Sequence, residues 1–237
     1  MARLPRLTIG GLLHHVLHRG NDGVTVFRDE VDRLAFVELL RREAPASGVD
    51  VHAYLLLPDQ YQLLLTPRDG TGLPRLLQQL GRAYVRRYNQ RHGRRGTLWE
   101  GRYRSTLVDA EQHALDVMVS VDFAAGQAEP AVSGADVTVS SHAQYAGLAT
   151  VPWLVAPSAY WALGNTPFAR EQTYRQRVQQ GLPEALQRDL QRAVETGWLF
   201  GSAAFKQQVE QRAGRRVAPG RPGRPAKLQA SVDSVPK

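Results

Sequence analysis

The stretch L55-L56-L57-P58-D59-Q60-Y61-Q62-L63-L64-L65 decides most of the fold. Two apolar runs flank a Pro-Asp turn, which is the pattern of a β-hairpin. Side chains two residues apart on a strand share a face, so Gln60 and Gln62 are predicted side by side, with Tyr61 on the opposite face. The runs are almost continuously apolar, which indicates a sheet covered on both faces at its centre. Two explanations are open for the two amides: one face of the sheet is partly exposed to solvent there, or the amides mark a functional site.

Further elements follow on both sides of this hairpin. Asp29 is placed as the N-cap of an amphipathic helix, and turn signals close the first strand. The order of strand, helix, hairpin, helix and strand is α+β and predicts a ferredoxin-like antiparallel sheet with helices on one face. The expected ranges are strand 12–18, helix 29–43, strands 49–57 and 60–66, helix 73–91, strand 102–108 and helix 110–123.

The rest of the chain is predicted to divide from this core. We expect a main domain over residues 1–150, to which the binding function discussed below is assigned, a C-terminal helical extension over 151–213 and a basic tail over 214–237. The extension contains helical patterns at 168–180, 183–196 and 202–212. The tail is rich in Pro and Gly and is predicted to be disordered. Its repeated G-R-P, with Arg221 and Arg224, is similar to a minor-groove AT-hook or is simply a solubilising segment.

Charge and composition indicate the class of partner. The 237 residues carry a net charge of +8 and no cysteine, which fits a reducing cytoplasm. No apolar run is long enough to cross a membrane, and no secretory segment is expected. Between residues 82 and 104 the sequence has many arginines and a single acidic residue, Glu100. A cluster of almost purely positive charge favours a nucleic-acid partner. These arginines are Arg82, Arg86, Arg87, Arg91, Arg94, Arg95, Arg102 and Arg104.

The order of several motifs resembles one known family. The motifs are H-H-V-L-H-R-G-N, V-H-A-Y-L-L-L-P and G-R-A-Y-V-R-R-Y-N-Q-R-H-G-R-R-G-T-L-W-E-G-R-Y-R-S. These motifs resemble those of the REP-associated tyrosine transposases of the HUH nuclease superfamily. The resemblance extends over nearly the whole chain, from residue 2 to about residue 227. The resemblance implies a domain that binds hairpins of repetitive extragenic DNA and nicks a single strand. In that family two histidines hold a divalent cation, and a tyrosine on a later helix attacks the phosphodiester.

The positions that carry catalysis in that family are all different here. By the resemblance, Gln60 and Gln62 stand where the histidines would be, Ser120 at the tyrosine and Ala124 at a polar residue that can contribute a third ligand. A glutamine offers a neutral carbonyl oxygen in place of an imidazole lone pair. A serine hydroxyl is a poorer leaving group than a phenol, and no partnering base is visible. We therefore expect no enzyme activity, no bound metal and no cofactor.

The binding half of the pattern is retained. We expect a catalytically inactive, transposase-derived protein that recognises hairpin or single-stranded DNA and acts in regulation, with RNA as an alternative. The expected contacts are the eight clustered arginines, Arg221, Arg224, Trp99 and Tyr103, where rings offer base stacking. Trp99 has the alternative of being a buried anchor for the next strand.

Two other functions stay open at this point. One is an active metal-dependent single-strand nuclease or transposase with a non-standard site. The other is a protein-interaction module that reuses the fold. The target sequence and the oligomeric state do not follow from the sequence.

Overall fold

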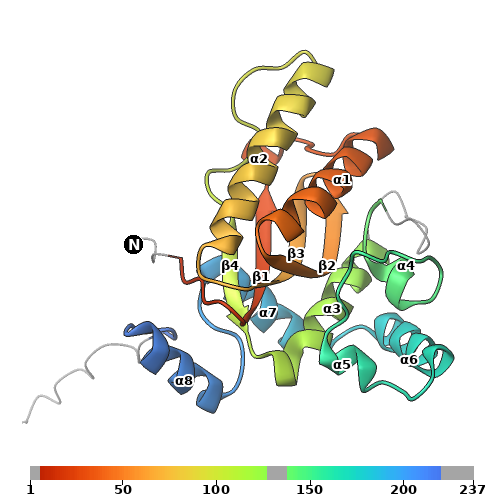
Figure 1. Cartoon of the computed structure of the whole chain (residues 1–237), viewed down its shortest axis with the longest axis vertical. Coiled ribbons are helices and arrows are strands. Elements are labelled where there is room, and N and C mark those ends of the chain that lie inside the picture. The colour runs from red at the N-terminus through yellow and green to blue at the C-terminus, as the bar shows by residue number, and fades with distance from the viewer. Residues whose placement is uncertain (1–5, 127–137, 220–237) are drawn as a thin grey trace, which may run out of the picture.

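The computed structural model describes residues 6–126 and 138–219. Four strands of the described chain form one antiparallel sheet in the order β2-β3-β1-β4. This order, with two helices between the strands, is the predicted ferredoxin-like arrangement (Figure 1). Its elements are β1 (Leu13–Arg19), α1 (Glu30–Ala46), β2 (Val49–Leu57), β3 (Gln60–Pro67), α2 (Gly72–Arg91) and β4 (Arg104–Val108), with a short 3-10 turn at Asn21–Gly23.

The hairpin of β2 and β3 has the register that its sequence indicates. Leu57 lies opposite Gln60, and Leu55 opposite Gln62. Tyr61 is buried against α1 and α2, while Gln62 lies on the other face of the sheet. The predicted alternation of the two glutamines with Tyr61 is therefore confirmed.

The first face of the sheet is covered by α1 and α2. The apolar stripe expected on α2 is buried along its whole length, from Leu73 to Tyr88. Asp29 caps α1 by accepting a hydrogen bond from the Asp32 backbone N–H. The helices also bury aromatic rings together, and Phe36 contacts both Tyr61 and Tyr84. These contacts fix the position of α2 and of the arginines on its outer side.

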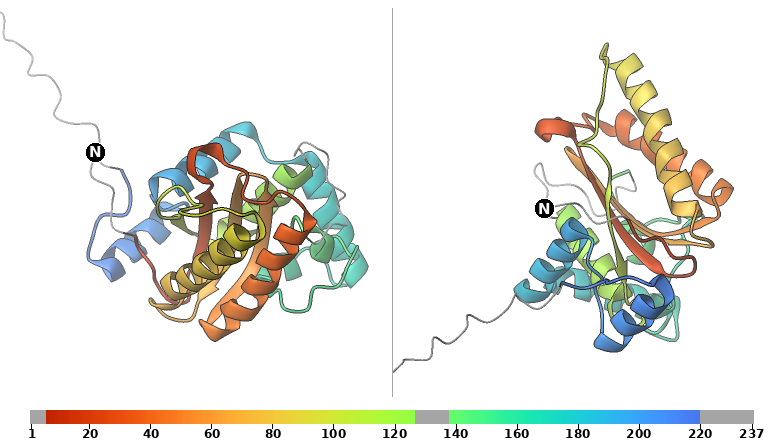
Figure 2. Two further views of the ribbon diagram at one scale, coloured as in Figure 1. Left: turned by 90° about the horizontal axis from the view of Figure 1, so that it is seen from above. Right: turned by 90° about the vertical axis from the view of Figure 1, so that its left-hand side faces the viewer.

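The second face of the sheet is covered by α3 (Ala110–Gly126) and by the extension (Figure 2). Three buried tyrosines, Tyr145, Tyr160 and Tyr174, share an apolar cluster with α3. The helices expected on one face are therefore α1 and α2, and the extension packs directly on the other face. Its helices are α4 (His142–Tyr145), α5 (Ser158–Trp161), α6 (Pro167–Gln180) and α7 (Glu184–Thr196).

The residues after α7 lie along the outer edge of β4. The Phe200 N–H donates to the Leu107 carbonyl, and the Asp109 N–H donates to the Phe200 carbonyl. After α8 (Ala203–Ala213), Val217 is buried and its carbonyl accepts from Leu199. The packed structure thus extends beyond residue 214, where the disordered tail was predicted to begin, because Val217 supplies an apolar anchor.

Two further predictions concern the ends of the chain and the membrane. Arg221 and Arg224, and with them the predicted AT-hook-like element, lie outside the described residues. Among the residues that the structure covers, no helix combines the length and the apolar character needed to cross a bilayer.

Candidate functional site

A hollow of about 550 Å³ lies between the second face of the sheet and α7. We call it the α7 hollow. His15 and Gln62 line it from the strands, and Ser120 and Ala124 line it from α3. Residues of α7, among them Gln191 and Glu195, complete its wall. Three of the four positions that were predicted to be degenerate, Gln62, Ser120 and Ala124, thus come together at one site, although they lie far apart in the sequence.

The fourth position, Gln60, does not line the hollow but joins its wall through hydrogen bonds. Its amide oxygen Oε1 accepts from Arg19 Nε at 3.2 Å. The Arg19 guanidinium also donates to Glu195 Oε1 at 2.8 Å, and this bond lowers the pKa of Glu195 below its ordinary value. Gln60 is therefore a support for the Arg19–Glu195 ion pair, which ties the end of β1 to α7.

Gln62 is also engaged with a neighbouring side chain. Its Oε1 accepts from His15 Nε2 at 2.9 Å, so the imidazole proton lies on Nε2. Burial lowers the pKa of His15 to about 4, which keeps the ring neutral near pH 7. The other nitrogen, Nδ1, is buried and has no hydrogen-bond partner among the described residues. The amide oxygens of Gln60 and Gln62 are thus both used within the protein.

These residues do not fit the divalent cation that the family resemblance implies. A glutamine can offer a cation only its neutral carbonyl oxygen, and each of these two oxygens already uses one of its two lone pairs to accept a hydrogen bond. Ala124 adds a methyl group where a polar ligand would be needed. Within residues 6–126 and 138–219, no group of three or more His, Asp or Glu side chains is placed to hold a metal.

The Ser120 hydroxyl also lacks the partner that a nucleophile needs. In the described part of the chain it makes no hydrogen bond to a histidine or carboxylate that could take its proton. His15 lines the same hollow, but its Nε2 proton is donated to Gln62. The positions predicted from the sequence therefore do lie together in the fold, and polar side chains there, such as His15 and Gln62, hydrogen-bond to one another.

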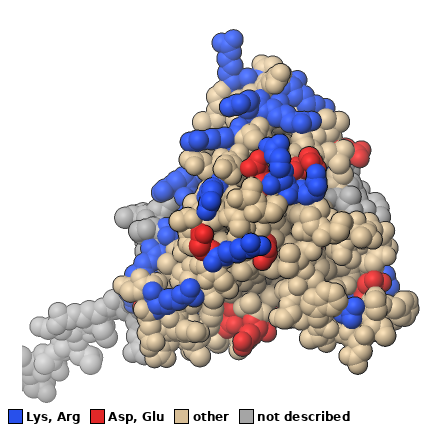
Figure 3. Space-filling model, viewed as in Figure 1, with Lys and Arg blue, Asp and Glu red and all other residues tan. Residues whose placement is uncertain are grey.

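The opposite side of the molecule carries exposed cations. Lys and Arg gather at the upper end of the view, where α2 ends (Figure 3). Four exposed arginines on α2 and on the loop that follows it have no carboxylate within ion-pair distance among the described residues, and we call them the α2 arginine patch: Arg82, Arg86, Arg87 and Arg95. They are available to an external anion.

Arg91 lies on the same helix but has a different environment. Its guanidinium donates to Asp29 Oδ2 at 2.7 Å and to Asp32 Oδ1 at 2.5 Å. These bonds raise the pKa of Arg91 and lower that of Asp29 to about 2. His92 Nε2 also lies 3.0 Å from the buried Asp32 carboxylate. Arg91 therefore links the end of α2 to the start of α1, and these ion pairs favour a structural role over the predicted contact with DNA.

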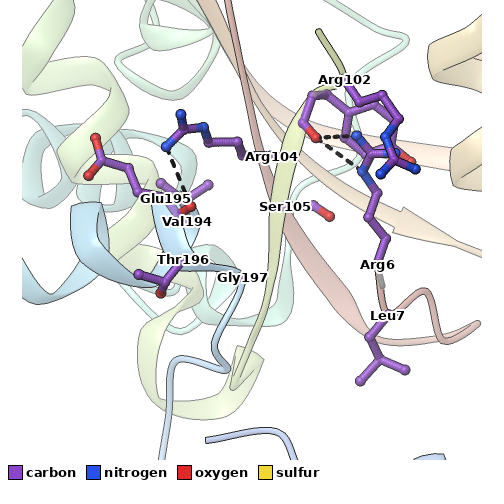
Figure 4. Close-up of a pocket in the computed structure, with 10 residues that line it drawn as sticks. Arg6, Leu7, Arg102, Arg104, Ser105, Val194, Glu195, Thr196 and Gly197 are labelled. Carbon is purple, nitrogen blue, oxygen red and sulfur yellow. Dashed lines mark hydrogen bonds between the residues drawn. The ribbon is translucent and has the colours of Figure 1, made fainter. Parts of the chain in front are cut away.

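The three remaining arginines of the predicted cluster are neither as fully paired as Arg91 nor part of the α2 arginine patch. Arg94 lies 5.7 Å from the Tyr88 ring centroid and is half-buried. Arg104 lies 3.8 Å from Glu100 and donates a long bond of 3.5 Å to the Glu195 carbonyl oxygen (Figure 4). Arg102 is exposed and has no carboxylate within ion-pair distance in the described ranges.

The two aromatic residues do not present free rings. Trp99 is only 8% exposed and stacks on His18 with 4.8 Å between ring centroids. This burial favours the predicted alternative of a buried anchor over base stacking. Tyr103 is half-buried and has the Arg6 guanidinium 3.9 Å from its ring centroid. Arg6 was missed because a lone arginine near the start of the sequence carries no local signal.

Comparisons with known proteins are sparse at the level of sequence. No family model matches the chain, and no curated protein matches it. Among solved structures, it is similar to a REP-associated tyrosine transposase bound to a REP hairpin, with a TM-score of 0.49 and 12% identity. That match covers 67% of this chain and 94% of the other.

A second solved structure is a "putative transposase" from Deinococcus radiodurans. Its TM-score is 0.35 and its identity is 25%, over 48% of this chain and 91% of the other.

Proposed function

We propose that this chain is a transposase-derived protein that binds nucleic acid without cutting it. Hairpin or single-stranded DNA is the proposed ligand, and regulation through that binding is the proposed role. The family assignment is supported by the sequence motifs and by the ferredoxin-like order of the sheet.

One observation carries the proposal. Gln62, Ser120 and Ala124 line a single hollow, which is where a metal, a nucleophile and a supporting ligand would have to meet. Gln62 and Ala124 are poorer ligands than the residue types of the family, Ser120 has no base beside it, and the amide oxygen of Gln62 already accepts a hydrogen bond from His15. Without a cation, nothing there would neutralise charge that develops on a phosphate during strand cleavage.

The binding part of the proposal is supported by the α2 arginine patch. Guanidinium groups match phosphate geometry, and their charge attracts a polyanion from a distance. Nearby carboxylates, by contrast, are held by Arg91 and do not offset the patch. The net charge of +8 points in the same direction.

The test combines binding and cleavage. Labelled hairpin and single-stranded DNA are titrated with the protein in a gel-shift assay at several salt concentrations, and the same mixtures are incubated with Mn²⁺. We expect salt-dependent binding with neither nicks nor covalent adducts. Nicks that disappear in Ser120→Ala or Gln62→Ala would establish an active nuclease and overturn the proposal.

A second protein, with the family's residue types restored, tests whether the chosen DNA is one that this fold binds. Gln60→His, Gln62→His and Ser120→Tyr are combined in one chain, which restores the residue types of the family at three positions. Binding that is absent in both proteins at low salt would reject the DNA-binding function and favour a protein partner.

A further inference from the structure

The C-terminal extension carries large apolar side chains on its surface. Phe168, Trp161 and Leu148 are 68%, 56% and 50% exposed, which makes them the three most exposed large apolar side chains of the described residues. Single apolar residues are ordinary on a protein surface, but a group that includes two aromatic rings is typical of a site that binds another protein. We call these three residues the α5–α6 surface.

The structure brings Trp161 next to the first turns of α6. The loop after Trp161 returns to this helix, where the Gly164 carbonyl oxygen accepts a hydrogen bond from the Arg170 side chain at 3.0 Å. The guanidinium carbon of Arg170 lies 4.7 Å from the Trp161 ring centroid. The indole is therefore held in a fixed place while more than half of it stays exposed.

Leu148 and Phe168 reach the same helix turns from two directions. Phe168 belongs to the first turn of α6, and Glu171 follows it three residues later on the same side of the helix. The Glu171 side chain lies so close to Gly147 that a Cβ there would overlap it. Leu148 is the next residue along the chain, so the three apolar side chains surround one end of α6.

This part of the protein is almost free of charge. Residues 143–169 contain no Asp, Glu, Lys, Arg or His, in a chain of which 22% of the residues are charged. Figure 3 shows few charged side chains around the position of α5. The first charges after this stretch are Arg170 and Glu171. Neither has a group of opposite charge within ion-pair distance in the part of the chain that the structure describes.

The charges select a second copy of the chain as the partner. Two copies carry +8 each, so contact through the arginine-rich side is opposed by repulsion, whereas contact through the uncharged stretch is not. A polyanionic partner, by contrast, is attracted to the arginines. In a two-fold pair the same surface lies on both subunits, so Arg170 of one copy can meet Glu171 of the other on each side of the axis.

We propose that the α5–α6 surface binds a second copy of this chain in a two-fold symmetric dimer. Trp161 and Phe168 are the anchors, since an aromatic ring contributes about 150–250 Å² when it is fully covered. A standard interface covers about 800 Å² on each partner, so two rings with their neighbours make a modest interface and a dissociation constant in the micromolar range. This inference goes beyond the proposed function and does not depend on DNA binding.

The dimer leaves the other binding surface free. In Figure 1, α2 lies at the upper end of the molecule, whereas α5 and α6 lie at the lower right. Each copy therefore keeps its α2 arginine patch exposed, and the dimer presents two of them.

Sedimentation velocity of the full chain tests the proposal over protein concentrations from about 1 to 200 µM, which bracket a micromolar dissociation constant. The first variant combines Trp161→Ser with Phe168→Ser. The second, Glu171→Arg, keeps both rings and makes the rim of the surface positive. The matched control combines Val31→Ser with Leu34→Ser, because these two side chains on α1 are also about half exposed.

The wild-type protein and the α1 control should change from monomer to dimer over this range. The variant without the two rings should remain a monomer throughout. Glu171→Arg should weaken association about fivefold at low salt and less at high salt, because it replaces attraction at the rim by repulsion. Should the ring variant have a lower thermal unfolding midpoint, Glu171→Arg decides.

A wild-type protein that stays monomeric at every concentration would refute the dimer. Association of the ring variant that equals that of the α1 control would refute this surface as the interface. Gel shifts with the same samples keep the two proposals apart. A monomer that binds DNA leaves the proposed function standing, and a dimer that binds no DNA leaves this inference standing without it.

Discussion

The α7 hollow and the α2 arginine patch lie on opposite sides of one sheet. They differ in whether their polar side chains already have partners within the protein. In the hollow, Gln62 bonds to His15, while Gln60 and Arg19 bond onward to Glu195. In the patch, four exposed guanidiniums have no carboxylate within ion-pair distance in the described ranges. Polar groups that satisfy one another have little left for a ligand, so the capacity to bind an external anion lies with the patch.

A single helix repeats this contrast at close range. Arg91 is held by Asp29 and Asp32, while Arg82 and Arg86 on the same helix face solvent. Residue type alone therefore does not decide which arginine binds a ligand. The position of carboxylates from another element does.

Acid should have the largest effect, because it acts on the framework that both regions share. Burial lowers the pKa values of His14, His15 and His18 to about 4, below the 6.5 of an exposed histidine. Between these values the unfolded chain binds protons that the folded protein excludes. Stability is therefore fully present above about pH 6.5 and falls as the pH drops toward 4, by about 2 kcal/mol per histidine between pH 7 and pH 5.

Urea unfolding at pH 7, 6 and 5 measures this loss directly. His15→Gln should reduce the pH dependence by about one proton, because it removes one buried imidazole. A free energy of unfolding that stays constant over this range would show that the three rings are not excluded from protonation in the folded state.

The next largest effect is expected at Trp99, where substitution distinguishes a role in the core from a role in DNA binding. Trp99→Ala should lower the free energy of unfolding by about 3–5 kcal/mol, because it opens a cavity among His18, Tyr61 and Tyr84. Trp99→Phe should cost less and should leave DNA affinity unchanged. Retained stability combined with weaker DNA binding in Trp99→Ala would return Trp99 to the binding surface.

The fold was largely predictable from local patterns. Gln60, Tyr61 and Gln62 alternate on β3, and the α2 stripe from Leu73 to Tyr88 repeats at helical spacing. Both signals arise from neighbours within a few residues, which the sequence displays directly.

The environments of the site residues were less predictable, because they depend on distant contacts. Arg91 meets Asp32 across 59 positions, and Arg19 meets Glu195 across 176. Neither pairing has a periodic signal. The sequence thus predicted which positions would share a site, but not that α7 would cover them or that Arg91 would pair with Asp29 and Asp32.

Removal of the three arginines of the α2 arginine patch that lie on the helix itself tests its side of the comparison. Arg82→Gln, Arg86→Gln and Arg87→Gln in one chain should weaken single-strand binding about 100-fold, at roughly 1 kcal/mol for each lost phosphate contact. The salt slope should become shallower by about 2. Stability should stay within about 0.5 kcal/mol, because these side chains are exposed. Arg41→Gln with Arg42→Gln removes two positive charges from α1, against three from the patch. A loss of affinity in that proportion would mean that only net charge matters.

The smallest effect on binding is expected from Gln62→Ala. The variant removes the hydrogen bond to His15, so stability should fall by about 1 kcal/mol. DNA affinity should change less than twofold, because the Gln62 amide oxygen already serves His15 and the side chain lies across the sheet from the patch. Anisotropy titration beside the triple arginine variant makes the comparison. If Gln62→Ala weakened binding as strongly as that variant, the strand would pass through the α7 hollow, and the hollow would have to be regarded as a binding site that lost only its chemistry.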